Sequence, residues 1–339
     1  MLRPAITGIA HHLPEQVLTN EDIARAHPEW PIVKIYRKTG IRARHIARPG
    51  ETASDLGVEA ARKLFATGCC RPEDIDLLVL CTQSPDYALP TTACMMQQRL
   101  ALPTTCAAFD FNMGCSGYIY GLSIVKGMLQ AGMVKKAILV TAETYTKFLA
   151  PNDKGVRTIF GDGAAATLVE QVECPEGADP LGPFVFGTDG RGWSKLIVHG
   201  SGARPVDDQA RALMPAGHPA DKLYMDGPEI FAFTIRQVPV TFQALLDRAA
   251  LTLEQVDMVL FHQANGYMLE HLRDRIGIPK EKFLVDIEDC GNTVSSTIPI
   301  ALRNAEQAGR IRRGMKIALV GFGVGYSWGG TMLDWQGLK

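Results

Sequence analysis

A repeated pattern constrains the fold of this chain more than any other feature of its sequence. Residues 74–81 (Asp-Ile-Asp-Leu-Leu-Val-Leu-Cys) match residues 255–262 (Gln-Val-Asp-Met-Val-Leu-Phe-His), 181 positions later. Gln-Ala-Gly at 130–132 recurs at 307–309, 177 positions later, and an apolar run follows each copy. Two nearly equal offsets indicate a duplicated unit, and such a repeat has to be recognised before the fold is assigned.

Each half of the repeat alternates apolar, strand-like runs with helical patterns. This alternation predicts an α/β fold in which each half forms a largely parallel sheet covered by helices. We expect an N-terminal half at residues 1–170, an irregular connection at 171–222 and a C-terminal half at 223–339. Because ligands of α/β proteins bind beyond the carboxyl ends of the strands, the two halves should present their strand ends to one shared cleft.

Composition excludes several classes of function. The chain has 339 residues, 46% of them hydrophobic, and a formal net charge of -1, which gives no global attraction for nucleic acid or for a membrane. We find no apolar run of the roughly 18 residues that a membrane-spanning helix needs, and no signal-peptide pattern. Eight cysteines without a Cys-x-x-Cys pair or zinc-ligand spacing are typical of reduced thiols in the cytoplasm.

The stretch around Cys115 has the pattern of a strand, a sharp turn and a helix. Apolar residues at 107–111 lead into a glycine turn, and apolar positions then recur with helical spacing from 118 to 129. This pattern places the thiol at the start of a helix, where free N–H groups and the helix dipole favour the thiolate. A thiolate there could accept an acyl group. The alternative is a small buried cysteine without chemistry, as most free cysteines are.

Three stretches in the C-terminal half add polar groups to the expected cleft. His262 ends a predicted strand and is followed by Gln263 and Asn265, which the interior of a strand disfavours. Asn292 follows a glycine, which alone predicts only a turn. Residues 321–325, Gly-Phe-Gly-Val-Gly, form a turn whose backbone could direct N–H groups at an oxyanion. No strand–helix–strand unit follows this turn, so it is not a dinucleotide fingerprint.

A basic segment lies between residues 28 and 48, and we expect it to be irregular. It is either a solvated surface loop or the mouth of a cleft that attracts the phosphates of a nucleotide or a carrier. Its cationic residues are Lys34, Arg37, Lys38, Arg42, Arg44 and Arg48.

Together these motifs resemble those of the β-ketoacyl-acyl-carrier-protein synthase III family, within the thiolase-fold superfamily. The resemblance covers essentially the whole chain. It rests on residues 38–45 (Lys-Thr-Gly-Ile-Arg-Ala-Arg-His), 114–117 (Gly-Cys-Ser-Gly), 160–164 (Phe-Gly-Asp-Gly-Ala), 262–265 (His-Gln-Ala-Asn), 291–293 (Gly-Asn-Thr) and the glycine-rich turn at Phe322. Each motif alone is weak, but their order and spacing are specific.

The resemblance implies a five-layered αβαβα thiolase fold, a homodimer and a decarboxylative Claisen condensation. The family's catalytic Cys, His and Asn fall on Cys115, His262 and Asn292. Cys115 would take an acyl primer from an acyl-CoA or an acyl-carrier protein, and malonyl-acyl-carrier protein would lose carbon dioxide and attack it. Backbone N–H groups of Cys115 and Val324 would form the oxyanion hole. No metal or other cofactor is implied.

The substrate-contacting positions that the resemblance implies include departures from the family pattern. Lys34 and Lys38 stand where a Trp and an Arg usually hold the adenine of CoA, and Lys154, with Arg157 close by, replaces another Arg. Lysine lacks the flat guanidinium that stacks on a base. Tyr267 replaces an arginine implicated in carrier docking. The other implied contacts are Leu89, Met225, Gly227, Phe231, Ala264, Asn265 and Phe322, of which Leu89, Met225 and Phe231 should line the acyl channel.

These departures lead to the hypothesis that the primer differs from acetyl-CoA. It would be a longer or functionalised acyl group, or one delivered on a carrier protein. Two other functions stay open. The first is a thiolase-fold acyltransferase that moves the Cys-bound acyl group to an alcohol or amine without decarboxylation, and the second is a non-catalytic partner subunit.

Overall fold

The computed structural model describes residues 1–339, except for the side chain of Ala210, and contains two five-stranded sheets. The strands of the first sheet are β1 (Leu2–His12), β4 (Leu77–Cys81), β5 (Ala107–Phe111), β6 (Lys136–Glu143) and β7 (Gly163–Glu173). Those of the second are β8 (Leu181–Thr188), β11 (Met258–Phe261), β12 (Phe283–Leu284), β13 (Lys316–Gly323) and β14 (Ser327–Asp334). The strand orders are β1-β7-β6-β4-β5 and β12-β11-β13-β14-β8.

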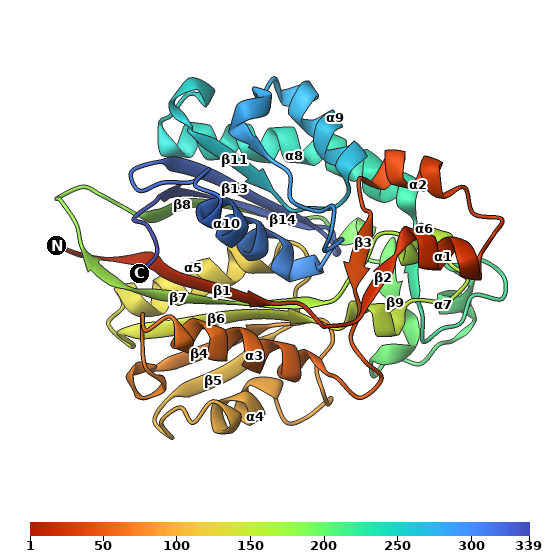
Figure 1. Cartoon of the computed structure of the whole chain (residues 1–339), viewed down its shortest axis with the longest axis horizontal. Helices are drawn as coiled ribbons and strands as arrows, with labels where there is room; N and C mark the ends of the chain where they lie inside the picture. Colours follow the sequence, from red (N-terminus) through yellow and green to blue (C-terminus); the bar gives the residue numbers. More distant parts are fainter.

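Helices form three layers around these sheets (Figure 1). The outer face of the first sheet packs against α3 (Ala53–Ala66) and α4 (Thr92–Arg99), and that of the second against α8 (Gly227–Ala249) and α9 (Gly266–Ile276). Between the sheets lie α5 (Gly117–Gln130) and α10 (Thr297–Gln307). This arrangement confirms the predicted five-layered αβαβα fold.

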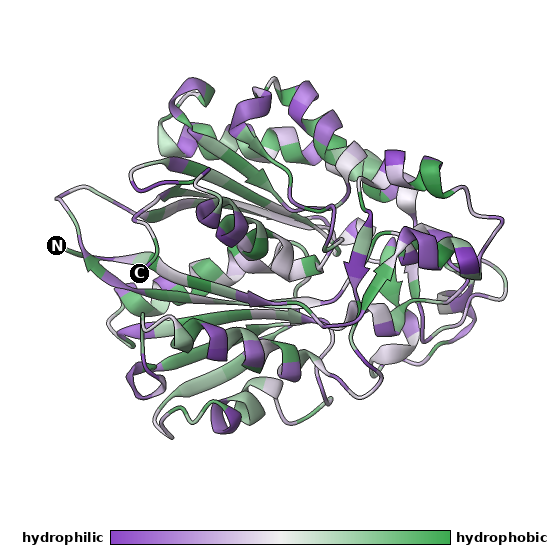
Figure 2. Ribbon diagram, viewed as in Figure 1, coloured by the Kyte–Doolittle hydropathy of each residue, from purple (hydrophilic) through white to green (hydrophobic). Residues whose placement is uncertain are grey.

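The central layer explains why the halves form one core. Leu122 of α5 and Leu302 of α10 are completely buried together with Leu139 of the first sheet and Leu319 of the second. A helix that lies between two sheets buries apolar side chains on both of its faces, because each face packs against a sheet. Figure 2 shows this pattern, with hydrophobic residues concentrated on the strands and hydrophilic residues on the outward faces of the outer helices.

The duplication is visible in the element boundaries. β6 begins at Lys136 and β13 at Lys316, 180 residues later, and α5 and α10 begin at Gly117 and Thr297 with the same offset. The expectation of largely parallel sheets was wrong for part of each half. β4 pairs in parallel with β5 and β6, and β11 with β12 and β13, whereas β7 and β1, like β14 and β8, join antiparallel. The three-residue turn between β13 and β14 permits only antiparallel pairing.

The basic segment at 28–48 is ordered, contrary to the sequence expectation. It contains α2 (Ile32–Thr39) and β3 (Ala43–His45), and β3 pairs with β2 (Val17–Thr19) next to α1 (Asn20–Ala26). Ile35 packs with Trp30 and Ile23 in a small separate cluster, so α2 buries one apolar stripe while its cations face solvent. The charges concealed this helical period in the sequence.

The expected irregular connection at 171–222 was wrong for β8, which is an edge strand of the second sheet. Gly187 of β8 lies against Trp328, and an added Cβ would sit 2.1 Å from the indole ring. The glycine that makes this approach possible is also the residue that weakens the strand pattern. Residues 171–222 also contain β9 (Leu196–Val198) and α7 (Asp208–Ala212), while α6 (Lys154–Arg157) precedes this segment and β10 (Leu223–Met225) follows it.

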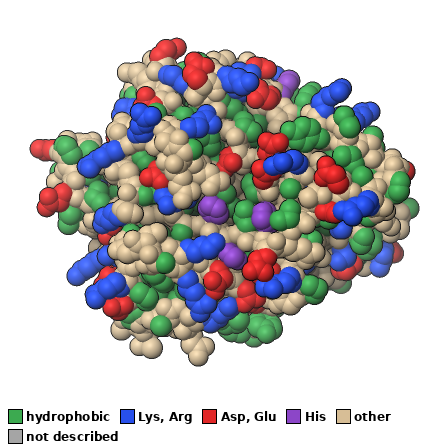
Figure 3. All heavy atoms as spheres, in the orientation of Figure 1, with side chains coloured by type: hydrophobic (Ala, Val, Ile, Leu, Met, Phe, Trp, Pro, Cys, Tyr) green, Lys and Arg blue, Asp and Glu red, His purple; other side chains and the backbone are tan. Residues whose placement is uncertain are grey.

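The surface carries both signs of charge. Figure 3 shows Lys and Arg side chains interspersed with Asp and Glu on the face that it presents. Within the described part of the chain, none of the helices is both long enough and apolar enough to cross a bilayer.

Candidate active site

Cys115 lies in the turn between β5 and α5, at the carboxyl end of a strand, as predicted. Its side chain is buried, 6% exposed. The backbone of β13 and its turn passes directly beside it, and an added Cβ on Gly323 would be 2.9 Å from the Cys115 Cβ. The neighbouring Ser116 hydroxyl hydrogen-bonds that of Ser327 at 2.7 Å. The turn of the first half therefore fits tightly against the glycine-rich turn of the second.

His262 and Asn292 approach the same point from the second sheet. His262 follows β11, where its backbone N–H donates to the Val320 carbonyl at 2.8 Å, and Asn292 follows β12. The Asn292 Nδ2 lies 3.5 Å from the His262 Nε2 and donates to the Ala264 carbonyl at 3.3 Å. Both side chains and Cys115 line one cavity of about 170 Å³.

The two halves hold Asn292 between them. Its backbone N–H donates to the Ile159 carbonyl at 2.9 Å, and the Gly161 N–H donates to the Asn292 carbonyl at 3.0 Å. The Phe-Gly-Asp-Gly stretch of the first half thus pairs with the Gly-Asn-Thr stretch of the second. This contact agrees with the prediction that the halves share one cleft.

The sequence expectation of a stabilised thiolate at Cys115 was wrong for the free protein. Burial raises the pKa of the Cys115 thiol to about 12, and the nearby Glu143 adds to this increase. The backbone N–H groups of Cys115 and Val324 point at the sulfur and lower the pKa, but by less than burial raises it. The start of a helix stabilises an anion only in part when no water reaches it. The resting Cys115 side chain is therefore a neutral thiol.

The same two N–H groups define a site for negative charge. Val324 lies in the turn after β13 and packs in the cluster around Cys115. Because its N–H and that of Cys115 converge on the sulfur, they are in position to donate to a carbonyl oxygen bonded next to it. The oxyanion hole expected at Cys115 and Val324 is compatible with this arrangement.

His262 is held as a neutral imidazole. Burial lowers its pKa to about 3. Its Nδ1 lies 2.8 Å from the hydroxyl oxygen of Thr297, which also accepts the N–H of Gln263 at 3.4 Å. The Nε2 faces the cavity beside Asn292.

Two residues of this centre were missed by sequence reasoning. Glu143, at the end of β6, is fully buried and accepts hydrogen bonds from the Ser84 and Ser295 hydroxyls at 3.1 and 2.9 Å. Burial raises its pKa to about 8. The signal for Glu143 in the sequence was an acidic residue at the end of the apolar run that forms β6. Thr297 gave no signal, because its role depends on its contact with His262.

Most implied substrate contacts do surround the cavity. Those lining it are Met225, Gly227, Phe231, Ala264, Asn265 and Phe322. A second cavity of about 480 Å³ adjoins the first along Ile159, Phe231 and Asn265, and we refer to it as the mouth. Lys38, Lys154 and Tyr267 line this mouth, where the Tyr267 ring stacks on Phe231 with centroids 5.9 Å apart.

Three implied contacts lie elsewhere. Lys34 is exposed on α2 and lines neither cavity. Arg157 lines a different cavity, together with Lys147, because successive side chains on the short helix α6 point in different directions. Leu89 is 82% exposed and does not line the acyl cavity of its own chain.

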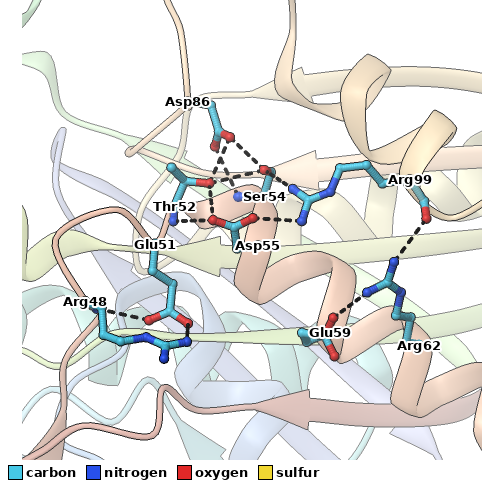
Figure 4. Close-up of polar contacts among 9 residues, drawn as sticks. All are labelled: Arg48, Glu51, Thr52, Ser54, Asp55, Glu59, Arg62, Asp86 and Arg99. Carbon is cyan, nitrogen blue, oxygen red and sulfur yellow. Dashed lines mark hydrogen bonds and ion pairs between the residues drawn. The ribbon is translucent and has the colours of Figure 1, made fainter.

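The loop that carries Leu89 is firmly anchored at its base (Figure 4). Asp86 accepts hydrogen bonds from the Thr52 and Ser54 hydroxyls at 2.9 and 2.6 Å, and Arg99 of α4 donates to Ser54 and Asp55, both at 2.7 Å. This network ties the loop between β4 and α4 to the start of α3. Leu89 is therefore exposed on a loop whose base is held in place by hydrogen bonds.

No group of three His, Cys, Asp or Glu side chains in the described structure is arranged to hold a metal ion. The chemistry of the cavity rests on a thiol, an imidazole, a carboxamide and backbone N–H groups. These groups can carry an acyl thioester and stabilise an oxyanion.

Comparison with known proteins gives one consistent family. Residues 109–190 match the family model described as 3-oxoacyl-[acyl-carrier-protein] synthase III, and residues 246–335 match the model of its C-terminal part. The chain is 35% identical to the β-ketoacyl-[acyl-carrier-protein] synthase III of Caldanaerobacter subterraneus subsp. tengcongensis, with 98% of this chain and 97% of that protein covered.

Solved structures agree. A 2.1 Å crystal structure of a 3-oxoacyl-(acyl-carrier-protein) synthase III superposes with a TM-score of 0.94 at 50% identity, covering 98% of this chain and all of that one. The 3-oxoacyl-(acyl-carrier protein) synthase from Burkholderia xenovorans LB400 gives a TM-score of 0.92 at 32% identity, with 99% and 96% covered.

Proposed function

Because this chain belongs to the 3-oxoacyl-[acyl-carrier-protein] synthase III family, we propose that the cavity around Cys115 is the active site of a decarboxylative Claisen condensation. The enzyme joins an acyl primer to malonyl-acyl-carrier protein with loss of carbon dioxide, giving a 3-oxoacyl-acyl-carrier protein. The supporting observation is the convergence of Cys115, His262 and Asn292 on one buried cavity. We assign the nucleophile to Cys115 and the stabilisation of the enolate to the other two.

In the first step the Cys115 sulfur attacks the carbonyl carbon of the acyl thioester. A carbon–sulfur bond to Cys115 forms, the bond to the donor's sulfur breaks, and the Cys115 proton leaves with the donor as its thiol. The oxyanion of the intermediate accepts hydrogen bonds from the N–H groups of Cys115 and Val324. Each such donor typically contributes about 3 kcal/mol to the stabilisation of the transition state.

In the second step malonyl-acyl-carrier protein replaces the departed donor. The bond to its carboxylate breaks, carbon dioxide leaves, and the electron pair forms an enolate that attacks the acyl carbon on Cys115. A carbon–carbon bond forms, the bond between the acyl carbon and the Cys115 sulfur breaks, and the departing thiolate takes a proton from solvent to restore the thiol. The Asn292 amide and the His262 Nε2–H donate to the enolate oxygen. We infer that Thr297 donates to Nδ1, because its contact with Nδ1 (2.8 Å) is shorter than that with the Val294 carbonyl (3.2 Å). This arrangement leaves the proton on Nε2.

We propose that both substrates are carried on thioester arms that enter through the mouth. Lys38 and Lys154 line this mouth and are candidates for pairing with the phosphate of acyl-CoA or of the carrier protein. Tyr267 and Phe231 present an aromatic surface there instead of an arginine. The primer consequently differs from acetyl-CoA in length, in functional groups or in the carrier that delivers it. The reaction as proposed needs no cofactor, and we assign it to the cytoplasm.

We also propose a homodimer. β5 is an edge strand of the first sheet, and its partly exposed residues leave one row of backbone groups available for pairing. Leu89 lies on the loop that follows β4, the strand next to β5. A second copy seated along β5 would bring Leu89 toward that copy's acyl cavity. This arrangement reconciles its expected role with its exposure.

Mass spectrometry of the intact protein tests the assignment. After incubation with a panel of acyl-CoA and acyl-carrier donors, the wild type should gain the mass of one acyl group, and Cys115→Ala should gain none. Asn292→Ala should still be loaded but release no carbon dioxide from malonyl-carrier and form no product. Loading that survives Cys115→Ala would refute the nucleophile.

The same experiment separates the condensing enzyme from the acyltransferase alternative. An acyltransferase would load Cys115 and pass the group to an alcohol or amine without releasing carbon dioxide from malonyl-carrier. Full-rate priming by acetyl-CoA, with no gain from longer or carrier-bound donors, would contradict the proposed difference in primer.

A further inference from the structure

A hydroxyl in the wall of the catalytic cavity has no hydrogen-bond partner. Thr234 lies on α8, its side chain is completely buried, and its Oγ1 is without a partner among the described residues. The residue lines the same cavity as Cys115 and His262. A buried hydroxyl left unpaired typically costs about 1–3 kcal/mol of stability, so a partner is expected from outside the chain.

The usual local partner is not used at this position. A Thr inside a helix commonly donates to the carbonyl four residues earlier. Thr241, farther along α8, does so at 2.9 Å to Gln237, and Thr39 of α2 does so at 3.0 Å to Ile35. Thr234 makes no such bond. Its hydroxyl therefore has no partner among the described residues, and a molecule that fills the cavity beside it is the candidate partner.

The surroundings of this hydroxyl are apolar. Ile230 and Phe231 lie one helical turn before Thr234 and line the same cavity, as do Met268 and Phe322. The polar side chains at the catalytic end are those already assigned to the thioester. The side-chain oxygen of Asn265 already has a hydrogen bond, because its Oδ1 accepts the Met268 N–H at 2.9 Å. Thr234 thus offers an isolated polar group on an apolar wall.

This pattern fits the arm by which both substrates would arrive. The pantetheine arm of CoA and of acyl-carrier proteins is a flexible chain in which two amides alternate with methylene groups. We propose that the Thr234 hydroxyl hydrogen-bonds an amide of this arm and is a specificity-determining residue for pantetheine thioesters. The inference rests on the proposed function. It adds a contact common to the acyl donor and the malonyl acceptor.

The test compares acylation rates of Cys115 at low donor concentration in the full-length enzyme, followed by intact mass. Thr234→Val keeps the shape of the side chain and removes the hydroxyl, so acylation by an acyl-CoA should slow by roughly two- to tenfold, the effect of one neutral hydrogen bond. Thr234→Ser keeps the hydroxyl and should retain the rate. Thr241→Val, which removes a satisfied buried hydroxyl from the same helix outside the cavity, should also react like the wild type.

A second pair of donors identifies the group that is bound. The acyl N-acetylcysteamine thioester retains one amide of the arm, whereas an alkyl thioester of the same acyl group has none. The loss in Thr234→Val should disappear with the alkyl thioester. An equal loss with both donor types, or an effect that follows an oxygen on the primer, would overturn the inference. An unchanged rate with acyl-CoA would also overturn it.

These outcomes are distinct from a failure of the proposed function. If no donor acylates Cys115 in the wild type, the assigned reaction is wrong. If donors acylate the wild type and Thr234→Val equally well, only the role of Thr234 is wrong.

Discussion

Cys115 combines a position in the wall of the cavity with a thiol that is difficult to ionise. Burial and the neighbouring Glu143 raise its pKa, and two backbone N–H groups lower it. The balance favours the neutral thiol at physiological pH. The same N–H groups can stabilise charge once it has moved to the oxygen of a bound thioester. The centre thus favours an anion that forms during the reaction over one that is present beforehand.

This balance predicts the pH dependence of alkylation. With a pKa of about 12, the thiolate fraction of Cys115 rises tenfold for each pH unit between pH 7 and 10. The rate of labelling by iodoacetamide should rise in the same proportion and show no plateau in this range. Peptide mapping after timed labelling measures this rate and separates Cys115 from the exposed Cys94. A plateau near pH 7 would contradict the prediction.

Glu143→Gln is the matched variant for this measurement. It removes a carboxylate whose own pKa is raised to about 8 by burial, while it keeps the size of the side chain. Above pH 8 the variant should be labelled faster than the wild type at Cys115, because the neighbouring negative charge is absent. Below that pH the two should be labelled at similar rates.

At the scale of single residues, the sequence predicted which residues belong to the site better than it predicted which residues contact them. Cys115, His262 and Asn292 follow predicted strands, so the topology could bring them together from the sequence alone. Thr297 and Thr234 matter only through what they contact or fail to contact. Neither property is visible before the helices are packed.

Among the elements, the hairpin of β13 and β14 has the most direct influence on the site. Gly323 ends β13 against Cys115, where an added Cβ would also lie 3.0 Å from the sulfur. Gly323→Ala should push the thiol away from the oxyanion hole. A displacement of about 1 Å can cost about 100-fold in rate, so we expect a loss of that order in acyl loading, measured by intact mass.

Gly127→Ala is the control for that variant. Gly127 lies on α5, and nothing lies within 4 Å of an added Cβ. Alanine there should raise the free energy of unfolding by up to about 1 kcal/mol through helix propensity and leave loading unchanged. If Gly323→Ala loads at the wild-type rate while remaining folded, the close approach is not required.

Elements with a regular apolar period were predicted well, and those with a mixed pattern were not. The helical spacing of apolar positions from 118 to 129 predicts α5, and the structure confirms it. Cations on the exposed face of α2 conceal its helical period, and Gly182, Pro183 and Gly187 interrupt the strand pattern of β8. In both cases contacts with distant residues, such as Trp328 against Gly187, supply what the local sequence lacks.

For the whole molecule, the edge strand β5 and the exposed Leu89 predict association. Light scattering on the purified protein at micromolar concentration should give twice the chain mass of 36.9 kDa. Leu89→Asp, which places a charge on the proposed contact, should shift the equilibrium to the monomer. Met133→Asp changes a residue of similar exposure (72%) outside β5 and its neighbouring loop and should leave the dimer intact. A wild-type mass of 36.9 kDa would contradict the dimer.

The duplication has a consequence for how the centre could have evolved. By the offsets of the repeat, Ser295 occupies the position of Cys115 and Cys81 that of His262. Ser295 donates to Glu143, and the Cys81 sulfur contacts the Met113 carbonyl at 3.0 Å, beside the nucleophile turn. Two of the three proposed catalytic residues therefore have a counterpart in the other half, and both counterparts contact residues close to Cys115. If two equal copies diverged, one set of equivalent positions would keep the catalytic residues, and the other set would keep only a structural role beside them.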